Sequence, residues 1–449
     1  FEHEKLLYYY PEGVDDTTTT RAIGLSEGLV RFTSTFSQDK PCETVNFKNK
    51  KCAFYEPEPG LWMVFVAGIF PNTPVVDAAV MHCIVRRCYA AYALFNGTFQ
   101  SCLDQDGRET LRRKLAIFIP QFLSTYKLKQ TPFFNAMEGI SFFPCDKNVF
   151  LQIQCLVNLV EKSFGEIKET FVMNRDLLMW SGLEQRDTRT LYNYLCIATD
   201  KYAEEESGTS KPYLPSVPVT GAISSASRHE LQYVNLLRAM QKRSGLVRIP
   251  PRKKDQDDKT RTLDENLAAV SNMYIGENSS QKRRVAIYSG RRGVSCVFLM
   301  DPEADTEYYV LNDFVKSHLS GIAPHINTRI VQTGDIFDGK LDYYCLYYND
   351  MNNAAKGMWS TASNSGDFTF PTHATHAVMR MHNDFGKRDE RPSEIVMRTS
   401  EGRWLVGRKS EQRELYVLFE DKDTINSIID VHEFLQRLNT GYFGNLFLD

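Results

Sequence analysis

Residues 176–195 read DLLMWSGLEQRDTRTLYNYL and place a short strand, a tight turn and a helix in direct succession. The apolar run LLMW has the length of a buried strand, and the following Ser-Gly pair turns the chain. In the helix, Leu191, Tyr194 and Leu195 recur at the i, i+3, i+4 spacing of one face. No recognisable catalytic motif accompanies these elements, so they predict the α/β core of a protein that binds rather than reacts.

Length and composition bound the architecture. A chain of 449 residues is too long for one core, and with about 100 to 200 residues per domain we expect three domains. The hydrophobic fraction of 42% and the net charge of −3 are typical of a soluble globular protein. A charge this close to neutral favours no polyanionic partner, so we expect no nucleic-acid binding.

The ten cysteines lie mostly in apolar segments and form no CxxC pair, which favours reduced thiols in the cytosol and no metal site. The longest apolar run, 61–70, is far shorter than the ~20 residues of a membrane-spanning helix. The opening FEHEKLL does not resemble a signal peptide. Because the chain begins at Phe1 rather than Met, we expect that a preceding segment is missing.

The first part of the chain predicts a small antiparallel sheet with helices, within a domain spanning 1–130. Apolar and alternating runs predict strands over 5–10, 45–55 and 61–66. A period of 3.6 residues predicts helices over 21–36, 76–95 and 108–126. The sequence EPEPG between the last two strands predicts a hairpin turn.

The same alternation recurs in a second domain, 150–325, and a third, 340–449. In the second we expect helices over 153–164, 186–197 and 306–319, and strands over 177–180, 285–289 and 294–300. In the third we expect strands over 343–348 and within 394–419, and helices over 376–385 and 425–438. The segment 200–280 is rich in Ser, Pro and charge, which predicts a long polar insertion without regular structure.

Four long motifs occur in a fixed order, namely CYAAYALFNGTF (88–99), GISFFPCDK (139–147), DLLMWSGLEQRDTRTLYNYL (176–195) and WLVGRKSEQRELYVLF (404–419). Together with the three α/β units, they resemble the Ccz-one family, the tri-longin subunits of Mon-Ccz complexes. The resemblance runs from Leu6 to the closing NLFLD and is weakest in 200–280. It implies an α/β fold of three longin domains, each a small antiparallel sheet packed between helices, of which the first lacks its opening strand.

The resemblance also implies a function. Members of this family pair with a Mon-one longin subunit, and the pair is a guanine-nucleotide exchange factor for the late-endosomal GTPase Rab-seven. This implies a cytosolic protein recruited peripherally to late endosomes and lysosomes, active in endosome maturation, lysosomal fusion and autophagy, and it leaves room for a further scaffold subunit. Exchange needs no acid, base or nucleophile. We therefore expect no covalent active site, no cofactor, and activity only in the assembled pair.

In this family the first longin domains of both partners form the GTPase-binding surface. The matching positions lie on the helix over 21–36 and the hairpin over 45–66, and the candidate contacts are Leu25, Leu29, Phe32, Phe54, Trp62 and Val64. For Phe32 and Trp62 a place in the core is the alternative, because large apolar side chains are usually buried.

The segment 231–254, LQYVNLLRAMQKRSGLVRIPPRKK, combines an apolar helix face with a run of basic residues. Such a segment is suited to an anionic membrane. The candidate contacts are Tyr233, Leu237, Lys242, Arg243, Arg252, Lys253 and Lys254. The alternative is a solvated loop, favoured by the acidic residues that follow directly at 255–258.

Other motifs predict chemistry less well. The G-x-S-x-G pattern around Ser26 is typical of a hydrolase, but no strand precedes it. The histidines His373, His376 and His382 lack companions that would complete a metal site. No phosphate-binding G-x-x-x-x-G-K-[ST] occurs, and GRRG (290–293) lacks its lysine and hydroxyl. The alternative functions are a subunit of another Rab exchange factor, serving lysosome-related organelles, and a scaffold or coat adaptor without exchange activity.

Overall fold

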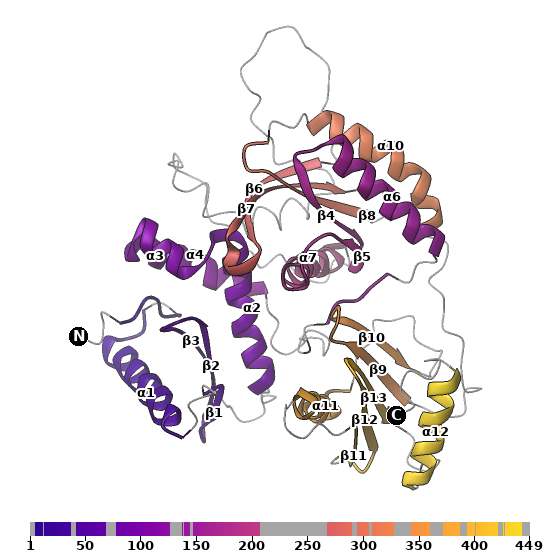
Figure 1. Ribbon diagram of the computed structural model, residues 1–449. Coiled ribbons are helices and arrows are strands. Elements are labelled where there is room, and N and C mark those ends of the chain that lie inside the picture. The colour runs from indigo at the N-terminus through magenta and orange to yellow at the C-terminus, as the bar shows by residue number, and fades with distance from the viewer. Residues whose placement is uncertain are drawn as a thin grey trace. The chain divides into compact units, whose positions relative to one another are not determined.

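A computed structural model of the chain contains three antiparallel sheets (Figure 1). The first two sheets belong to one compact unit, Phe1–Lys129 with Cys145–Thr328, and the third belongs to another, Gln130–Pro144 with Arg329–Asp449. The residues that the structure describes are 5–11, 13–36, 42–68, 78–125, 137, 139–143, 147–206, 267–289, 294–304, 308–326, 343–359, 371–386, 393–399, 401–420, 425 and 427–441.

The first sheet has three strands in the order β1-β2-β3. Its strands are β1 (Thr44–Asn46), β2 (Lys50–Glu58) and β3 (Leu61–Gly68), and its helices are α1 (Asp16–Ser34), α2 (Ala78–Asn96), α3 (Phe99–Asp106) and α4 (Arg108–Thr125). Helices α1 and α2 lie on opposite sides of this sheet (Figure 1). The strand expected over 45–55 is divided by a tight turn, in which the Phe47 amide donates to the Lys50 carbonyl at 2.8 Å.

The strand expected over 5–10 does not form. The backbone carbonyls there accept hydrogen bonds from α4 instead, Leu6 from Arg112 at 2.8 Å and from Arg108 at 3.0 Å, and Leu7 from Arg112 at 3.1 Å. Carbonyls held by guanidinium groups are not available to a strand ladder. Within the described residues, β3 pairs with β2 alone, so its other edge is open.

The second sheet has five strands in the order β5-β4-β8-β7-β6. Helices α6 and α10 cover one face and α7 the other (Figure 1). In chain order the elements are α6 (Lys147–Ser163), β4 (Ile167–Asn174), β5 (Leu177–Ser181), α7 (Gln185–Glu206), β6 (Leu267–Ile275), the short 3-10 helix Glu277–Ser279, β7 (Gln281–Ser289), β8 (Val294–Met300) and α10 (Tyr308–Ile326).

The expectation of an irregular insertion over 200–280 is wrong at both ends. Helix α7 continues to Glu206, and β6 pairs antiparallel with β7 from Leu267↔Tyr288 to Ile275↔Gln281. Strand β6 lies at the edge of the sheet, where a strand buries fewer apolar side chains, and this explains its weak sequence signal. Residues 207–266, the greater part of the expected insertion, lie outside the described residues.

The third sheet repeats the order of strands and helices that the second shows from β4 onward. Its strands follow the order β10-β9-β13-β12-β11. The elements are β9 (Tyr343–Asn349), β10 (Ala354–Trp359), α11 (Thr372–Gly386), β11 (Glu394–Arg398), β12 (Trp404–Ser410), β13 (Arg413–Phe419) and α12 (Ile428–Gly441). From the GISFFPCDK motif, Ile140 joins the edge of this sheet in a parallel bridge to Ala354, and its amide donates to Asn353 at 2.7 Å.

Two of the sequence motifs meet in the core of the first unit. Phe95 of α2 packs on Tyr194 of α7 with ring centroids 4.8 Å apart, and Arg87 donates to Asn193 at 3.1 Å. Helix α2 therefore contacts both the first sheet and α7. None of the helices in the described ranges combines the length and the hydrophobicity that crossing a bilayer requires.

Candidate partner-binding surface

The first helix begins at a polar cap. The Asp15 carboxylate accepts hydrogen bonds from the Thr18 amide at 3.0 Å and from the Thr17 hydroxyl. These bonds, with that of Thr17 the largest cause, lower the pKa of Asp15 to about 2. The carboxylate satisfies a free N–H of the first turn and complements the helix dipole, which explains why the run of threonines starts a helix here.

The side of α1 that faces the protein carries both apolar and hydroxyl-bearing residues, with Ile23 and Val30 half-buried there. Thr19 is buried, and Ser26 and Thr33 are partly buried. The Ser26 and Thr33 hydroxyls donate to the carbonyls of Ala22 and Leu29, each at 2.8 Å. Both hydroxyls are thus satisfied within the helix.

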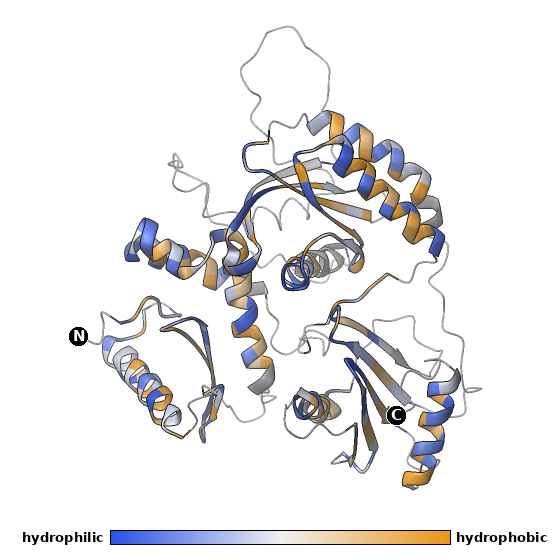
Figure 2. Ribbon diagram, viewed as in Figure 1, coloured by the Kyte–Doolittle hydropathy of each residue, from blue (hydrophilic) through white to orange (hydrophobic). Residues whose placement is uncertain are grey.

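The opposite side of α1 is apolar and exposed to solvent. The exposed fraction is 40% for Leu25, 61% for Phe32 and 76% for Phe36, and Leu29 is half-buried at the margin of this surface. Phe32 and Phe36 contact each other edge to face with centroids 4.9 Å apart. The sequence periodicity therefore predicted the helix correctly, and the structure adds that most of its apolar stripe is exposed. Hydrophobic and hydrophilic residues alternate along the ribbon of α1 (Figure 2).

Two glycines lie next to the exposed apolar residues of α1. Gly24 and Gly28 precede Phe32 at intervals of four residues, so the three lie in one row along the helix. A Cβ atom built at either glycine would meet no atom within 4 Å. Glycine in a helix interior lowers stability by about 0.8–1.0 kcal/mol relative to alanine, and this row also permits close approach of another backbone.

The sheet contributes a second exposed apolar area through β3. Met63, Phe65 and Ala67 pack towards the core residues Met81 and Val85 of α2. The alternate positions Val64 and Val66 lie on the other face and are 37% and 51% exposed. We call this area, together with the apolar side of α1, the α1/β3 surface, defined by Gly24, Leu25, Gly28, Leu29, Phe32, Phe36, Val64 and Val66.

Two of the expected contact residues of the hairpin lie differently. Phe54 is only 1% exposed, because it lies in β2, the middle strand of the sheet, opposite Val64. It is therefore a core residue, and its inclusion among the candidate contacts needs correction. Trp62 is half-buried.

The hairpin tip is fixed by Glu58, which the sequence analysis missed. Its carboxylate accepts hydrogen bonds from the Tyr89 hydroxyl at 2.7 Å and from the amides of Phe99 and Gln100 at 2.6 and 2.7 Å. Phe99 and Gln100 begin α3, so the carboxylate binds at a helix N-terminus, where negative charge is favoured. The hairpin that carries β3 is thereby held on α2 and α3.

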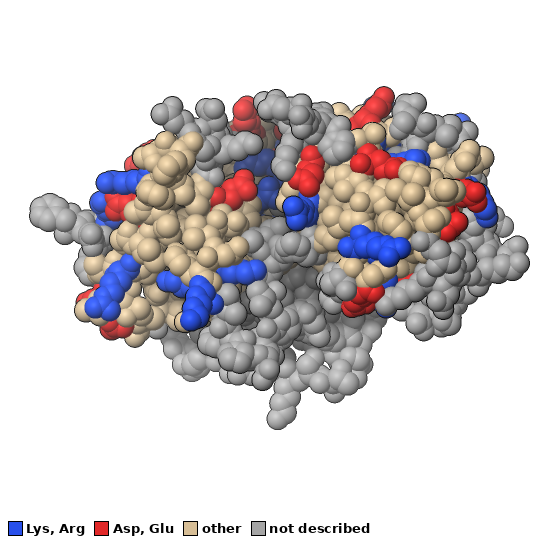
Figure 3. Space-filling model, turned by 90° about the horizontal axis from the view of Figure 1, so that it is seen from below, with Lys and Arg blue, Asp and Glu red and all other residues tan. Residues whose placement is uncertain are grey.

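Charged residues frame α1 without crossing its apolar side. Glu27 pairs with Lys5 at 2.8 Å and with Arg31 at 2.6 Å, and the hydrogen bond from Lys5 lowers the pKa of Glu27. On the face of the molecule in Figure 3, the described acidic and basic side chains are interspersed among uncharged residues.

The hydrolase and metal interpretations gain no support. Ser26 lies in the middle of α1 rather than between a strand and a helix, so the geometry of a strained nucleophile is not met. His382 binds the buried Glu414 at 2.6 Å, and Lys409 binds the same carboxylate at 3.0 Å. The described side chains include no group of three His, Cys, Asp or Glu that could hold a metal ion.

Several predicted residues lie outside the described part of the chain. These are the membrane candidates Tyr233, Leu237, Lys242, Arg243, Arg252, Lys253 and Lys254, the side chains of His373 and His376, and the turn 290–293. The contact that was expected between 231–254 and a membrane stays a prediction. Strands β7 and β8 do pair as the expected hairpin.

Comparison with known proteins gives two family matches and several full-length relatives. Residues 1–97 match the family described as "First Longin domain of INTU, CCZ1 and HPS4", and residues 339–438 match "Intu longin-like domain 3". A "Vacuolar fusion protein CCZ1 homolog" from Danio rerio is 30% identical over 99% of this chain and 92% of its own length. Proteins of the same description are 28% identical in Nematostella vectensis and 25% in Dictyostelium discoideum, each across 94% of the relative.

These matches confirm the fold expected from the sequence. The first and third sheets fall in segments recognised as longin, and the second sheet shares the element order of the third. The α1/β3 surface lies in the first of these longin segments.

Proposed function

Because the chain belongs to the family of vacuolar fusion protein CCZ1 homologues and so has a role in membrane trafficking, we propose that it is one subunit of a two-subunit guanine-nucleotide exchange factor. Its partner in this proposal is a Mon-one longin protein, and the substrate is the late-endosomal GTPase Rab-seven. The proposal extends to recruitment from the cytosol to late endosomes and lysosomes, and to functions in lysosomal fusion and autophagy.

The observation that carries the proposal is the exposed apolar side of α1. Leu25, Phe32 and Phe36 are 40%, 61% and 76% exposed, so the fold of this chain leaves much of their apolar surface in solvent. Contiguous exposed apolar residues are typical of sites of protein association. Burying one such side chain contributes about 1.5–3 kcal/mol, so this helix can anchor a stable heterodimer.

Exchange then requires differential binding and no bond chemistry. A factor that binds the nucleotide-free GTPase more tightly than the loaded one weakens nucleotide affinity by the same ratio. A thousandfold weakening corresponds to about 4 kcal/mol of differential contact, which a modest interface supplies. In this proposal the chain contributes shape and apolar contacts, and no catalytic acid, base or cofactor.

The test is release of a fluorescent nucleotide from Rab-seven, measured with this chain alone, with the Mon-one partner alone and with the pair. We expect acceleration only by the pair. Leu25→Asp should prevent pairing and abolish the acceleration. Leu159→Asp on α6 is the matched control, because Leu159 is also a helical leucine and is 46% exposed. If the assembled pair leaves release at its intrinsic rate, the proposal fails and a scaffold role becomes the better explanation.

A further inference from the structure

A thiol, an amine and a carboxylate meet at the corner between α3 and α4. The Lys114 amine lies 3.5 Å from the Cys102 sulfur and 2.9 Å from the Asp106 carboxylate. The Cys102 sulfur lies 3.8 Å from the same carboxylate oxygen. Cys102 is 3% exposed and the Lys114 side chain 19%, so the amine lies on the solvent side of the sulfur.

A buried hydroxyl lies beside the same corner. Tyr92 is fully buried, and its phenol oxygen has the Cys102 sulfur as a weak hydrogen-bonding neighbour but no oxygen or nitrogen partner within the part of the chain that the structure describes. Burial, followed by the nearby Cys102 thiol, raises the pKa of this phenol. Sulfur is a weak acceptor, and an oxygen atom attached to the Cys102 sulfur would place a stronger acceptor beside the hydroxyl.

We propose that Cys102 and Lys114 form a site of oxidative modification, in which hydrogen peroxide joins them through a sulfur–oxygen–nitrogen bridge. The proposal is independent of the exchange activity proposed above. The bridge would fix α3 to α4 covalently, next to the α3 N-terminus on which Glu58 holds the hairpin.

The chemistry balances with two molecules of peroxide. The first oxidises the thiol to a sulfenic acid and leaves one water. The second accepts the electrons released when the sulfenic oxygen bonds to the Lys114 nitrogen, and two further waters leave. Sulfur and nitrogen each lose two electrons. The neutral amine loses one proton, for which Asp106 is the adjacent acceptor, and the sulfenic hydroxyl loses the other.

The surroundings predict a slow reaction. Burial raises the pKa of Cys102, and the Lys114 ammonium opposes this rise only in part. The hydrogen bond and charge of Asp106 raise the pKa of Lys114 against the effect of burial. Thiolate and free amine are therefore both scarce at neutral pH, and the yield should increase as the pH is raised.

The test uses the full chain, treated with hydrogen peroxide under native conditions, blocked with a thiol reagent, digested and analysed by mass spectrometry. We expect a linked pair of peptides containing Cys102 and Lys114, heavier than their sum by one oxygen and lighter by two hydrogens. A thiol reductant should separate them. Cys102→Ser and Lys114→Arg should each abolish the link, and Lys114→Arg keeps the pairing with Asp106.

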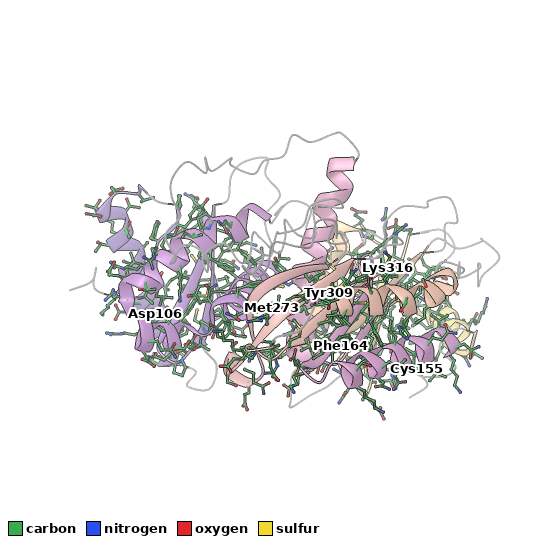
Figure 4. All side chains as sticks on the ribbon, turned by 90° about the horizontal axis from the view of Figure 1, so that it is seen from above. Asp106, Cys155, Phe164, Met273, Tyr309 and Lys316 are labelled. Carbon is green, nitrogen blue, oxygen red and sulfur yellow. The ribbon has the colours of Figure 1, made fainter. Side chains whose placement is uncertain are left out.

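The internal reference is Cys155, an exposed thiol on another helix, α6 (Figure 4). It should be oxidised faster than Cys102 and form no covalent link to a lysine. The same treatment in urea should give no link, because the chain no longer holds the amine at the sulfur. Three results would overturn the proposal. The first is a Lys114 that stays unlinked while Cys102 is unmodified or over-oxidised. The others are a link that lacks the added oxygen and a link that also forms when the peroxide treatment is carried out in urea.

Discussion

Replacing Gly24 and Gly28 of α1 by alanine should strengthen the free chain and weaken its complex. A Cβ atom at either position meets nothing within 4 Å, and neither glycine has a positive φ. Each substitution in a helix interior is then worth about 0.8–1.0 kcal/mol, and together they should stabilise α1 by roughly 2 kcal/mol. Because the chain has several domains, one global unfolding energy would not be well defined.

Native-state hydrogen exchange of the α1 amides measures the effect locally. A gain of about 1.4 kcal/mol corresponds to a tenfold change in an equilibrium constant, so the α1 amides should exchange roughly ten to thirty times more slowly in the double variant. The α12 amides of the third sheet's unit serve as the reference and should not change. If α1 exchanges faster instead, then the glycine row is already covered in the free chain.

The same double variant tests how a partner approaches the helix. If the partner backbone packs on the glycine row, two methyl groups on this side push it away, and the affinity of the pair should fall although α1 itself is more stable. Titration of the partner by calorimetry gives this affinity. Unchanged affinity would refute the assignment of the glycine row to the interface, while leaving the apolar residues to be tested by Leu25→Asp.

Three further predictions concern the supports of the fold. Glu58→Gln removes a charged acceptor shared by three donors and should destabilise the hairpin by about 1–3 kcal/mol, seen as faster amide exchange in β2 and β3. Gly407→Ala places a Cβ 2.9 Å from the Met381 sulfur and 3.2 Å from Phe385, and should lower the free energy of unfolding of the third sheet's unit by about 1–3 kcal/mol. Burial raises the pKa of Glu414, but its hydrogen bonds to His382, Tyr416 and Lys409 outweigh this effect and lower the pKa below the ordinary 4.5. The stabilisation of the fold by the ionised carboxylate is therefore complete above about pH 4.5 and is lost as the pH falls through the native pKa. Glu414→Gln should remove this dependence and flatten the fall in the free energy of unfolding at acid pH.

The sequence predicted the elements with strong periodicity and missed those with weak or long-range signals. The hairpin of β2 and β3 and helices α1, α2 and α4 follow from local patterns. Strand β6 was missed because it is an edge strand after a polar stretch, and α3 because it has only eight residues. The segment 5–10 has strand composition, but its carbonyls are bound by arginines about a hundred residues away.

The candidate site was also predictable only where its residues follow a local pattern in the sequence. Its apolar residues on α1 have a local spacing, and Gly24 and Gly28 were visible inside the helical pattern, although they were considered only as part of a G-x-S-x-G pattern. Glu58 could not be found, since its partners lie 31 to 42 residues away in sequence. Phe54 was misplaced because alternation does not say which strand lies in the middle of the sheet: Phe54 shares a face with its exposed partner Val64, but it lies in the middle strand and is buried.

The orientation of α1 connects the fold to the proposed function. The half-buried side of α1 holds Ile23 and Val30 together with Thr19, Ser26 and Thr33, while Leu25 and Phe32 of the same helix are exposed. Hydroxyl groups bonded to the helix backbone allow the inward side to pack without unsatisfied donors. The apolar side is then available to a second protein, and the free energy of its burial contributes to association rather than to folding. Such a helix is expected in a subunit whose activity appears only when a partner covers it, which is why Leu25→Asp should leave the chain folded and abolish exchange by the pair.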